Sequence, residues 1–142
     1  MCRSATVAAV FLVLGASRVC LADEPLAHTK DSLDTVKESV KAGKAVIVDV
    51  REQNEWEAGH LKGAIFAPQS KLNSEADAAA LIKSLPKDKI IYTHCAAGRR
   101  ALACGDILKK HGFDVRPLKP GYKELVAAGF ETEQPTKAEP KK

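Results

Sequence analysis

Residues Lys89–Ala101 read KIIYTHCAAGRRA and join a strand pattern directly to a helix pattern. The run KIIYT is short and apolar, as in strands that are buried on both faces of a sheet. Residues 100–110 then carry apolar side chains at helical spacing, and Gly112 ends this pattern. The intervening loop, which contains Cys95, therefore lies where a strand ends and a helix begins.

The same alternation of short apolar runs and helical patterns continues through the chain. In the first helical pattern, apolar residues recur between Asp31, a candidate cap, and Gly43, a stop signal. Strands are predicted over residues 45–50, 64–67, 89–93 and 113–118, and helices over residues 31–43, 52–58, 75–85, 100–110 and 122–128. This order predicts an α/β fold with a central parallel sheet of about five short strands, covered by helices on both faces. In such sheets ligands bind at the carboxyl ends of the strands, where Cys95 lies.

The composition fits one ordinary globular domain. The chain has 142 residues, of which 45% are hydrophobic and 28% charged, and its net charge is +4. The lysines are scattered, so this charge does not predict nucleic-acid binding. We place the domain at residues 31–133, after a polar lead-in at residues 23–30. The tail, residues 134–142, is rich in Lys and Pro and is predicted to be disordered.

The first 22 residues resemble a signal peptide. Arg3 supplies a positive start, residues 5–15 form an apolar core, and small residues at 20 and 22 suit cleavage after Ala22. The apolar run is shorter than the roughly 20 residues that a spanning helix needs. From this pattern we expect export to the periplasm or outside the cell, with no stable membrane insertion after cleavage. The alternative is that the segment is an uncleaved anchor or a buried helix.

Two cysteines, Cys95 and Cys104, remain after the expected cleavage. Two cysteines do not make a disulfide scaffold, and Cys104, nine positions later on the predicted helix, is interpreted as a small buried hydrophobe. No Cys-x-x-Cys or His-x-x-x-His spacing is present, and the histidines are dispersed. The sequence therefore predicts no zinc site and no need for a metal or an organic cofactor.

The loop after Cys95 is suited to surround a negative charge. Backbone N–H groups at a helix start lack partners inside the helix, and the helix dipole adds positive charge there. Gly98 permits a positive φ angle, so the loop can curl and direct its N–H groups inward. In that field the Cys95 thiolate, which is the nucleophilic form, is favoured. The predicted anion-binding loop consists of Ala96, Ala97, Gly98, Arg99 and Arg100, and the direction of the two arginine side chains stays open.

This loop resembles those of two families, the protein tyrosine phosphatases and the rhodanese sulfurtransferases. The phosphatase pattern is His-Cys, five residues, then arginine, but here that arginine position is Ala101. The loop from Cys95 through Arg100 has six residues, the length typical of rhodaneses that handle sulfur. No general acid for a phosphatase is identifiable either. The loop length therefore favours sulfur chemistry over phosphate chemistry.

Two further blocks resemble the rhodanese family in the expected order. Residues 49–64, DVREQNEWEAGHLKGA, are similar to its first block, and residues 119–130 are similar to its closing block. The resemblance covers about residues 30–133. Many rhodaneses carry a serine just after the loop arginine, where this chain has Ala101. This difference implies one less hydrogen bond for the thiolate but leaves the backbone loop intact.

The polar residues of the first block are interpreted as structural support. Asp49, Arg51 and Glu55 are expected to form a local ion pair or cap. His60 is expected to be a hydrogen-bonded structural residue. His94 precedes the cysteine on a strand, so its side chain should point to the opposite face.

The resemblance implies a sulfurtransferase that forms a persulfide on Cys95. The expected donor is a small anion such as thiosulfate, and the acceptor is a thiol, cyanide in an assay, or an unidentified protein. Two alternatives stay open. One is a sulfur-delivery or binding module for a protein partner, and the other is a phosphatase or arsenate reductase that uses the same cysteine.

Overall fold

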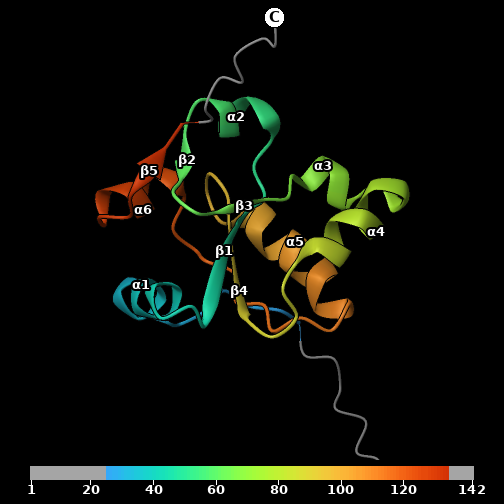
Figure 1. The fold of residues 1–142 in the computed structure, drawn as a ribbon, viewed down its shortest axis with the longest axis horizontal. Helices are drawn as coiled ribbons and strands as arrows, with labels where there is room; N and C mark the ends of the chain where they lie inside the picture. The colour runs from blue at the N-terminus through green and yellow to red at the C-terminus, as the bar shows by residue number, and fades with distance from the viewer. Residues whose placement is uncertain (1–24, 135–142) are drawn as a thin grey trace, which may run out of the picture.

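The computed structural model describes residues 25–134, in which helices and strands alternate (Figure 1). The predicted signal peptide and nearly all of the predicted tail lie outside the described residues. Within them, no helix combines the length and the apolar composition needed to cross a membrane. The helices are α1 (Leu33–Lys41), α2 (Gln53–Glu57), α3 (Gln69–Leu72), α4 (Glu75–Ser84), α5 (Arg99–Lys110) and α6 (Tyr122–Ala127). The strands are β1 (Ala45–Asp49), β2 (His60–Leu61), β3 (Ile65–Phe66), β4 (Ile90–His94) and β5 (Thr132–Glu133).

The central sheet is parallel and has the order β3-β1-β4. Strand β1 pairs with β4 from Ala45 opposite Ile90 to Asp49 opposite His94, and with β3 at Val48 opposite Ile65. The predicted α/β class with a central parallel sheet is confirmed. All three strands are short, and their carboxyl ends lie at the same edge of the sheet.

The central sheet has three regular strands rather than the predicted five or so. The segment predicted as a strand over residues 113–118 forms a single bridge, between Val115 and Ile91, although Leu118 also donates its N–H to Thr93 O at 2.9 Å. Pro117 has no N–H group, but Arg116 and Leu118 on either side of it donate to Ile91 O and Thr93 O, so this segment runs along β4 as an irregular edge. In addition, β2 and β5 form a separate antiparallel pair rather than joining the central sheet.

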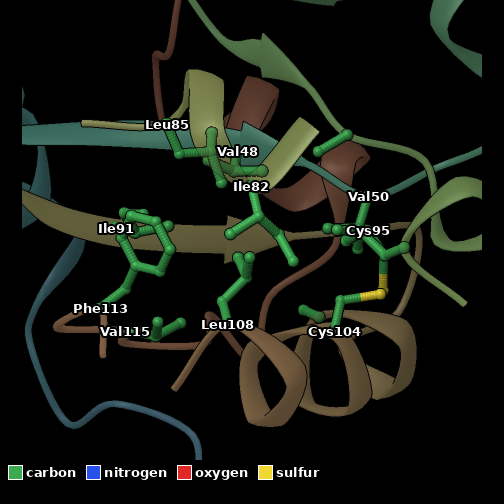
Figure 2. Close-up of a cluster of buried hydrophobic side chains, with 13 residues drawn as sticks. Val48, Val50, Ile82, Leu85, Ile91, Cys95, Cys104, Leu108, Phe113 and Val115 are labelled. Atoms are coloured by element: carbon green, nitrogen blue, oxygen red, sulfur yellow. The ribbon is translucent and has the colours of Figure 1, made fainter. Parts of the chain in front are cut away.

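Helices cover both faces of the central sheet. In Figure 1, α1 and α6 lie on one side, and α3, α4 and α5 lie on the other. Successive side chains of a strand point to opposite faces, so each strand supplies both cores. The core beside α1 and α6 includes Val36, Ile47, Leu61, Tyr92, Leu118 and Leu125. The core beside α4 and α5 includes Val48, Ile82, Ile91, Cys95, Cys104 and Leu108 (Figure 2).

The start of α1 corrects one prediction. Ser32, not Asp31, is the N-cap, because its side chain accepts a hydrogen bond from Thr35 N at 3.1 Å. The Asp31 carboxylate instead accepts the Tyr92 hydroxyl at 2.7 Å and the Arg116 guanidinium at 3.0 Å. These two contacts hold the pKa of Asp31 below its usual value, with the Tyr92 bond the larger cause.

Candidate active site

The loop from Cys95 to Gly98 connects the end of β4 to the start of α5. Gly98 is the N-cap of α5 and has a φ of +83°, a conformation that strongly favours glycine. A Cβ at Gly98 would lie 2.7 Å from Lys119 O, so the position also lacks space for a side chain. The end of β4 is tied to the first turn of α5 by the Thr93 hydroxyl, which donates to Ala101 O at 2.9 Å. Strand, loop and helix therefore form one locally braced unit.

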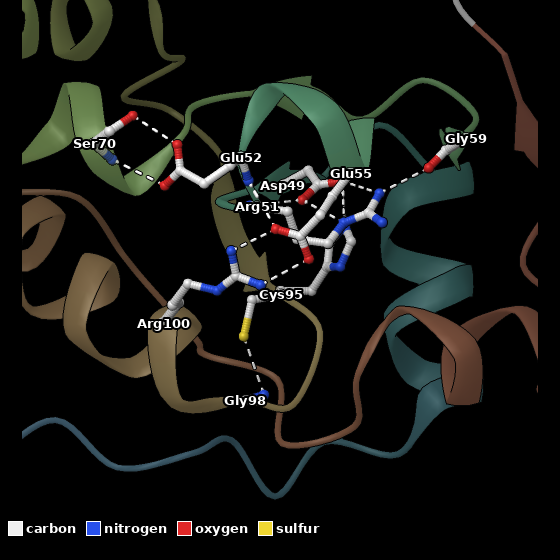
Figure 3. Close-up of polar contacts among 10 residues, drawn as sticks. Asp49, Arg51, Glu52, Glu55, Gly59, Ser70, Cys95, Gly98 and Arg100 are labelled. Carbon is white, nitrogen blue, oxygen red and sulfur yellow. Dashed lines mark hydrogen bonds and ion pairs between the residues drawn. The ribbon is translucent and has the colours of Figure 1, made fainter. Parts of the chain in front are cut away.

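The sulfur of Cys95 lies against the main chain of this loop. The Gly98 N–H donates to Cys95 Sγ at 3.1 Å (Figure 3). Cys95 is 1% exposed, yet it lines a cavity of about 360 Å³. The cavity is lined by Gln69, Cys95, Ala96, Ala97, Arg99, Arg100 and Ala103. The loop residues that the sequence predicted are thus brought together around the sulfur, and short alanine side chains form much of the rim.

Arg100 is held beside the sulfur by an acidic residue from α2. Its guanidinium makes two hydrogen bonds with the Glu55 carboxylate, at 2.6 and 2.8 Å (Figure 3). The Arg100 contact lowers the pKa of Glu55 to about 2, and the Glu55 contact, with a smaller contribution from the Cys95 sulfur, raises the pKa of Arg100. Arg99, by contrast, is exposed. The two arginines that line the cavity are therefore not equivalent.

The contact of Glu55 with Arg100 corrects the predicted grouping of the first block. Asp49 and Arg51 do form a local ion pair, which is buried and has an Nη2–Oδ2 distance of 2.7 Å. Glu55 is not part of that pair, because it accepts from Arg100 and from the Glu52 N–H in a capping box. Arg51 also donates to Gly59 O at 2.9 Å. The first block thus takes part in two separate ionic contacts: the buried Asp49–Arg51 pair within it, and the Glu55–Arg100 contact at the cavity.

The closing block supports the loop from the other side. Tyr122 N–H donates to Cys95 O at 2.9 Å, and its ring lies 4.0 Å from the Arg51 guanidinium carbon. Gly121 has no side chain, and a Cβ there would collide with Ala96 O. These residues belong to the closing block, and the sequence alone predicted no role for them. Glycine in the sequence Pro-Gly-Tyr was the available signal for a close backbone approach.

The histidines near the loop lie outside the cavity. The His60 ring stacks on Trp56 at a centroid distance of 3.5 Å, and its Nδ1 lies 3.2 Å from Trp56 O. His94 is fully buried, its Nε2 is 3.5 Å from Asp49 Oδ2, and its two ring nitrogens make no hydrogen bond. Burial lowers the pKa of His94 to about 4, so the ring is neutral at neutral pH. Neither ring is among the side chains that line the Cys95 cavity.

The described residues contain no group of three or more side chains placed to hold a metal ion. The residues around the Cys95 cavity supply a thiol, backbone N–H groups, the carboxamide of Gln69 and two guanidinium groups. Such a set can hold an anion against a sulfur nucleophile.

The comparison with protein families agrees with this arrangement. The family model described as the rhodanese-like domain matches residues 32–128. The chain belongs to the rhodanese-like family. The match spans both ionic contacts, the Cys95 loop and the Gly121–Tyr122 support of this rhodanese-like domain.

The individual relatives of this rhodanese-like domain share about a third or less of its residues. The chain is 34% identical over 91 residues to the uncharacterized protein YqhL of Bacillus subtilis, and the match covers 62% of this chain and 68% of that protein. It is 30% identical to the tRNA uridine(34) hydroxylase of Hamiltonella defensa, covering 77% of this chain but only 32% of that protein. Among solved structures, the human single-domain sulfurtransferase TSTD1 is similar with a TM-score of 0.55 and 25% identity, covering 72% of this chain and 96% of that chain.

Proposed function

We propose that the protein is a sulfurtransferase that carries sulfane sulfur on Cys95, with thiosulfate or a similar small anion as the donor. The observation that carries this proposal is the hydrogen bond from the Gly98 N–H to Cys95 Sγ in a cavity lined by Arg99 and Arg100. The likeness to a single-domain sulfurtransferase that covers nearly all of its own chain supports it.

The first step loads sulfur onto the protein. The Cys95 thiolate attacks the outer sulfur of thiosulfate, a sulfur–sulfur bond forms, the bond to the sulfonate sulfur breaks, and sulfite leaves with the electron pair. The Gly98 N–H and the free N–H groups at the start of α5 stabilise the anionic sulfur. Arg99 and Arg100 attract the dianionic donor, since both line the cavity.

The second step returns the protein to its starting form. An acceptor thiolate, or cyanide in an assay, attacks the outer sulfur of the Cys95 persulfide. The new bond forms to the acceptor, the persulfide bond breaks, and the Cys95 thiolate leaves. No net oxidation occurs, and the two half-reactions predict ping-pong kinetics.

Mass spectrometry of the protein after treatment with thiosulfate tests this proposal. We expect Cys95 to gain the mass of one sulfur atom and to lose it again when cyanide is added. The Cys95→Ser variant should gain nothing. A reduced and folded sample in which Cys95 stays unmodified by thiosulfate and by other sulfane donors would overturn the proposal, and hydrolysis of an aryl phosphate by the same sample would point to phosphatase chemistry instead.

A further inference from the structure

A second cavity lies beside the Cys95 cavity and has no part in the two steps above. Its volume is about 520 Å³, and we call it the side groove. It is lined by Pro25, Leu26, His28, Arg99, Leu102, Ala103 and Asp106. Arg99 and Ala103 also line the Cys95 cavity, so the two hollows adjoin at these residues. The side groove is therefore next to the place where a molecule would react at Cys95.

The wall of the side groove is fixed to the loop that holds the sulfur. The segment before α1, expected to be a lead-in, packs on the domain, since Thr29 N–H donates to Pro117 O at 2.8 Å. The His28 Nε2 lies 3.1 Å from Gly98 O, in the loop itself. Leu26 lies against Gly105, where a Cβ would be only 2.9 Å from the leucine. The groove is thus a built feature whose wall is attached to the loop around Cys95.

The chemistry of the side groove is apolar with one available positive charge. Leu26, Leu102 and Pro25 supply the apolar surface. The carboxylate of Asp106 is paired with Lys110 at 2.8 Å. Arg99 is exposed and makes no ion pair within residues 25–134. A ligand that fits the groove therefore has an apolar part and an acidic group.

We propose that the side groove binds the body of a peptide-borne acceptor thiol, with an apolar side chain against Leu26 and Leu102 and an acidic group on Arg99. This inference rests on the proposed function, because the acceptor takes sulfur from the Cys95 persulfide. A free small thiol fits within the Cys95 cavity and gains nothing from the groove. In the transfer, the acceptor thiolate forms a bond to the outer sulfur, the Cys95–sulfur bond of the persulfide breaks, and Cys95 leaves as its thiolate.

Single-turnover transfer from the loaded protein tests the inference. The protein is first loaded with thiosulfate and freed of excess donor, and loss of sulfur is then followed by mass spectrometry. The probes are free cysteine and three acetylated tetrapeptides, Glu-Leu-Cys-Gly, Glu-Ser-Cys-Gly and Lys-Leu-Cys-Gly. We expect the Glu-Leu peptide to react about tenfold faster than either other peptide, after correction for the thiolate fraction of each probe.

Two variants separate the groove from the general chemistry. Leu102→Ser should slow transfer to the Glu-Leu peptide about tenfold and leave loading and transfer to free cysteine unchanged. Val126→Ser removes an exposed apolar side chain from α6 and should change none of these rates. Leu26→Ser provides a second test if Leu102→Ser does not fold.

The outcomes of the two proposals are distinguishable. Failure to load sulfur on Cys95 sinks the proposed function. Normal loading followed by equal rates for all peptides, or rates that do not respond to Leu102→Ser and Leu26→Ser, overturns the groove inference alone. The groove inference is also overturned if Leu102→Ser slows transfer to the Glu-Ser peptide as much as transfer to the Glu-Leu peptide. The apolar contact with the leucine would then have no role.

Discussion

Cys95 and Cys104 belong to the same buried cluster but have different surroundings. Both are free, and both are almost completely inaccessible, at 1% and 0% exposure. In Figure 2 the Cys104 side chain points from α5 toward Cys95. Cys95, at the end of β4, receives an N–H and lines a cavity, whereas Cys104, within α5, is surrounded by the apolar core. Burial raises the pKa of Cys104 to about 12, with the nearby Cys95 sulfur as a second cause.

The contrast predicts that burial alone does not decide whether a cysteine can react. A nucleophilic cysteine needs donors for the thiolate and a path for the substrate. Cys95 has both, through Gly98 and the cavity, although its average exposure is as small as that of a core residue. Cys104 has neither, and it fills space beside Ala101 and Leu108 on the buried face of α5.

The largest expected difference between the two cysteines is in alkylation rate. With iodoacetamide at pH 8, Cys95 in the folded protein should react at least about 100-fold faster than Cys104, because a thiol with a pKa of about 12 is almost entirely protonated there. Peptide mapping by mass spectrometry measures both rates in one sample. Unfolding in urea is the control and should bring the two rates together. Comparable rates in the folded state would contradict the assignment of Cys95 as the nucleophile.

The second prediction concerns the hydrogen bond from Gly98. Gly98→Ala should slow thiosulfate loading about 10- to 100-fold, because the new Cβ collides with Lys119 O and moves the N–H away from Cys95 Sγ. Gly112→Ala is a matched control, since Gly112 has nearly the same φ, +84°, and open space around it. Gly112→Ala should lose about 1 kcal/mol of stability from the backbone strain, and Gly98→Ala should lose more because of the added collision, both measured by urea unfolding. Equal loading rates in the two variants would show that the Gly98 N–H does not assist the reaction at Cys95.

How much of the fold and of the candidate site could be predicted depends on how far apart the interacting residues are in the sequence. Strand β4, the loop and α5 are contiguous, so local patterns placed Cys95 correctly at a strand end before a helix. The Glu55–Arg100 pair joins residues 45 positions apart, and the contact of His28 with Gly98 O joins residues 70 apart. Periodicity carries no information about such pairs. The two-residue strands β2 and β5 were also beyond reach, because a pattern of period two needs a longer run.

The third prediction tests whether Glu55 holds the positive charge of Arg100 beside Cys95. Glu55→Gln should lower the free energy of unfolding by about 1–2 kcal/mol at pH 7, with allowance for solvent screening of a partly exposed pair. It should also slow loading several-fold, since Arg100 loses its anchor. The pKa of Glu55 is lowered from 4.5 to about 2, so its contribution is complete above pH 4.5 and disappears as the pH falls toward 2.

Urea unfolding of Glu55→Gln and the unmodified protein from pH 7 to pH 2 measures this difference. Glu131→Gln is the control, because it breaks an ion pair with Lys62 in which both side chains are well exposed. We expect Glu131→Gln to have little effect at any pH. A Glu55→Gln difference that stays constant down to pH 2 would show that the carboxylate charge is not what stabilises the site.

The smallest effect on function is expected from Cys104, and it completes the comparison of the two cysteines. Cys104→Ala removes a buried sulfur from the core and should cost about 1 kcal/mol of stability while changing loading and transfer less than about twofold. Cys104→Ser places a hydroxyl among apolar side chains and should cost more, about 1–3 kcal/mol, because the group lacks a strong partner. The thiol of Cys104 could instead donate a hydrogen bond to the Cys95 sulfur, as a serine after the loop arginine could in related domains. In that case Cys104→Ser would be the more active variant, although it is the less stable one. Cys104→Ser would then keep the loading rate and Cys104→Ala would lose it, so loading measured on both variants at matched folded fractions separates a space-filling thiol from one that takes part in the chemistry.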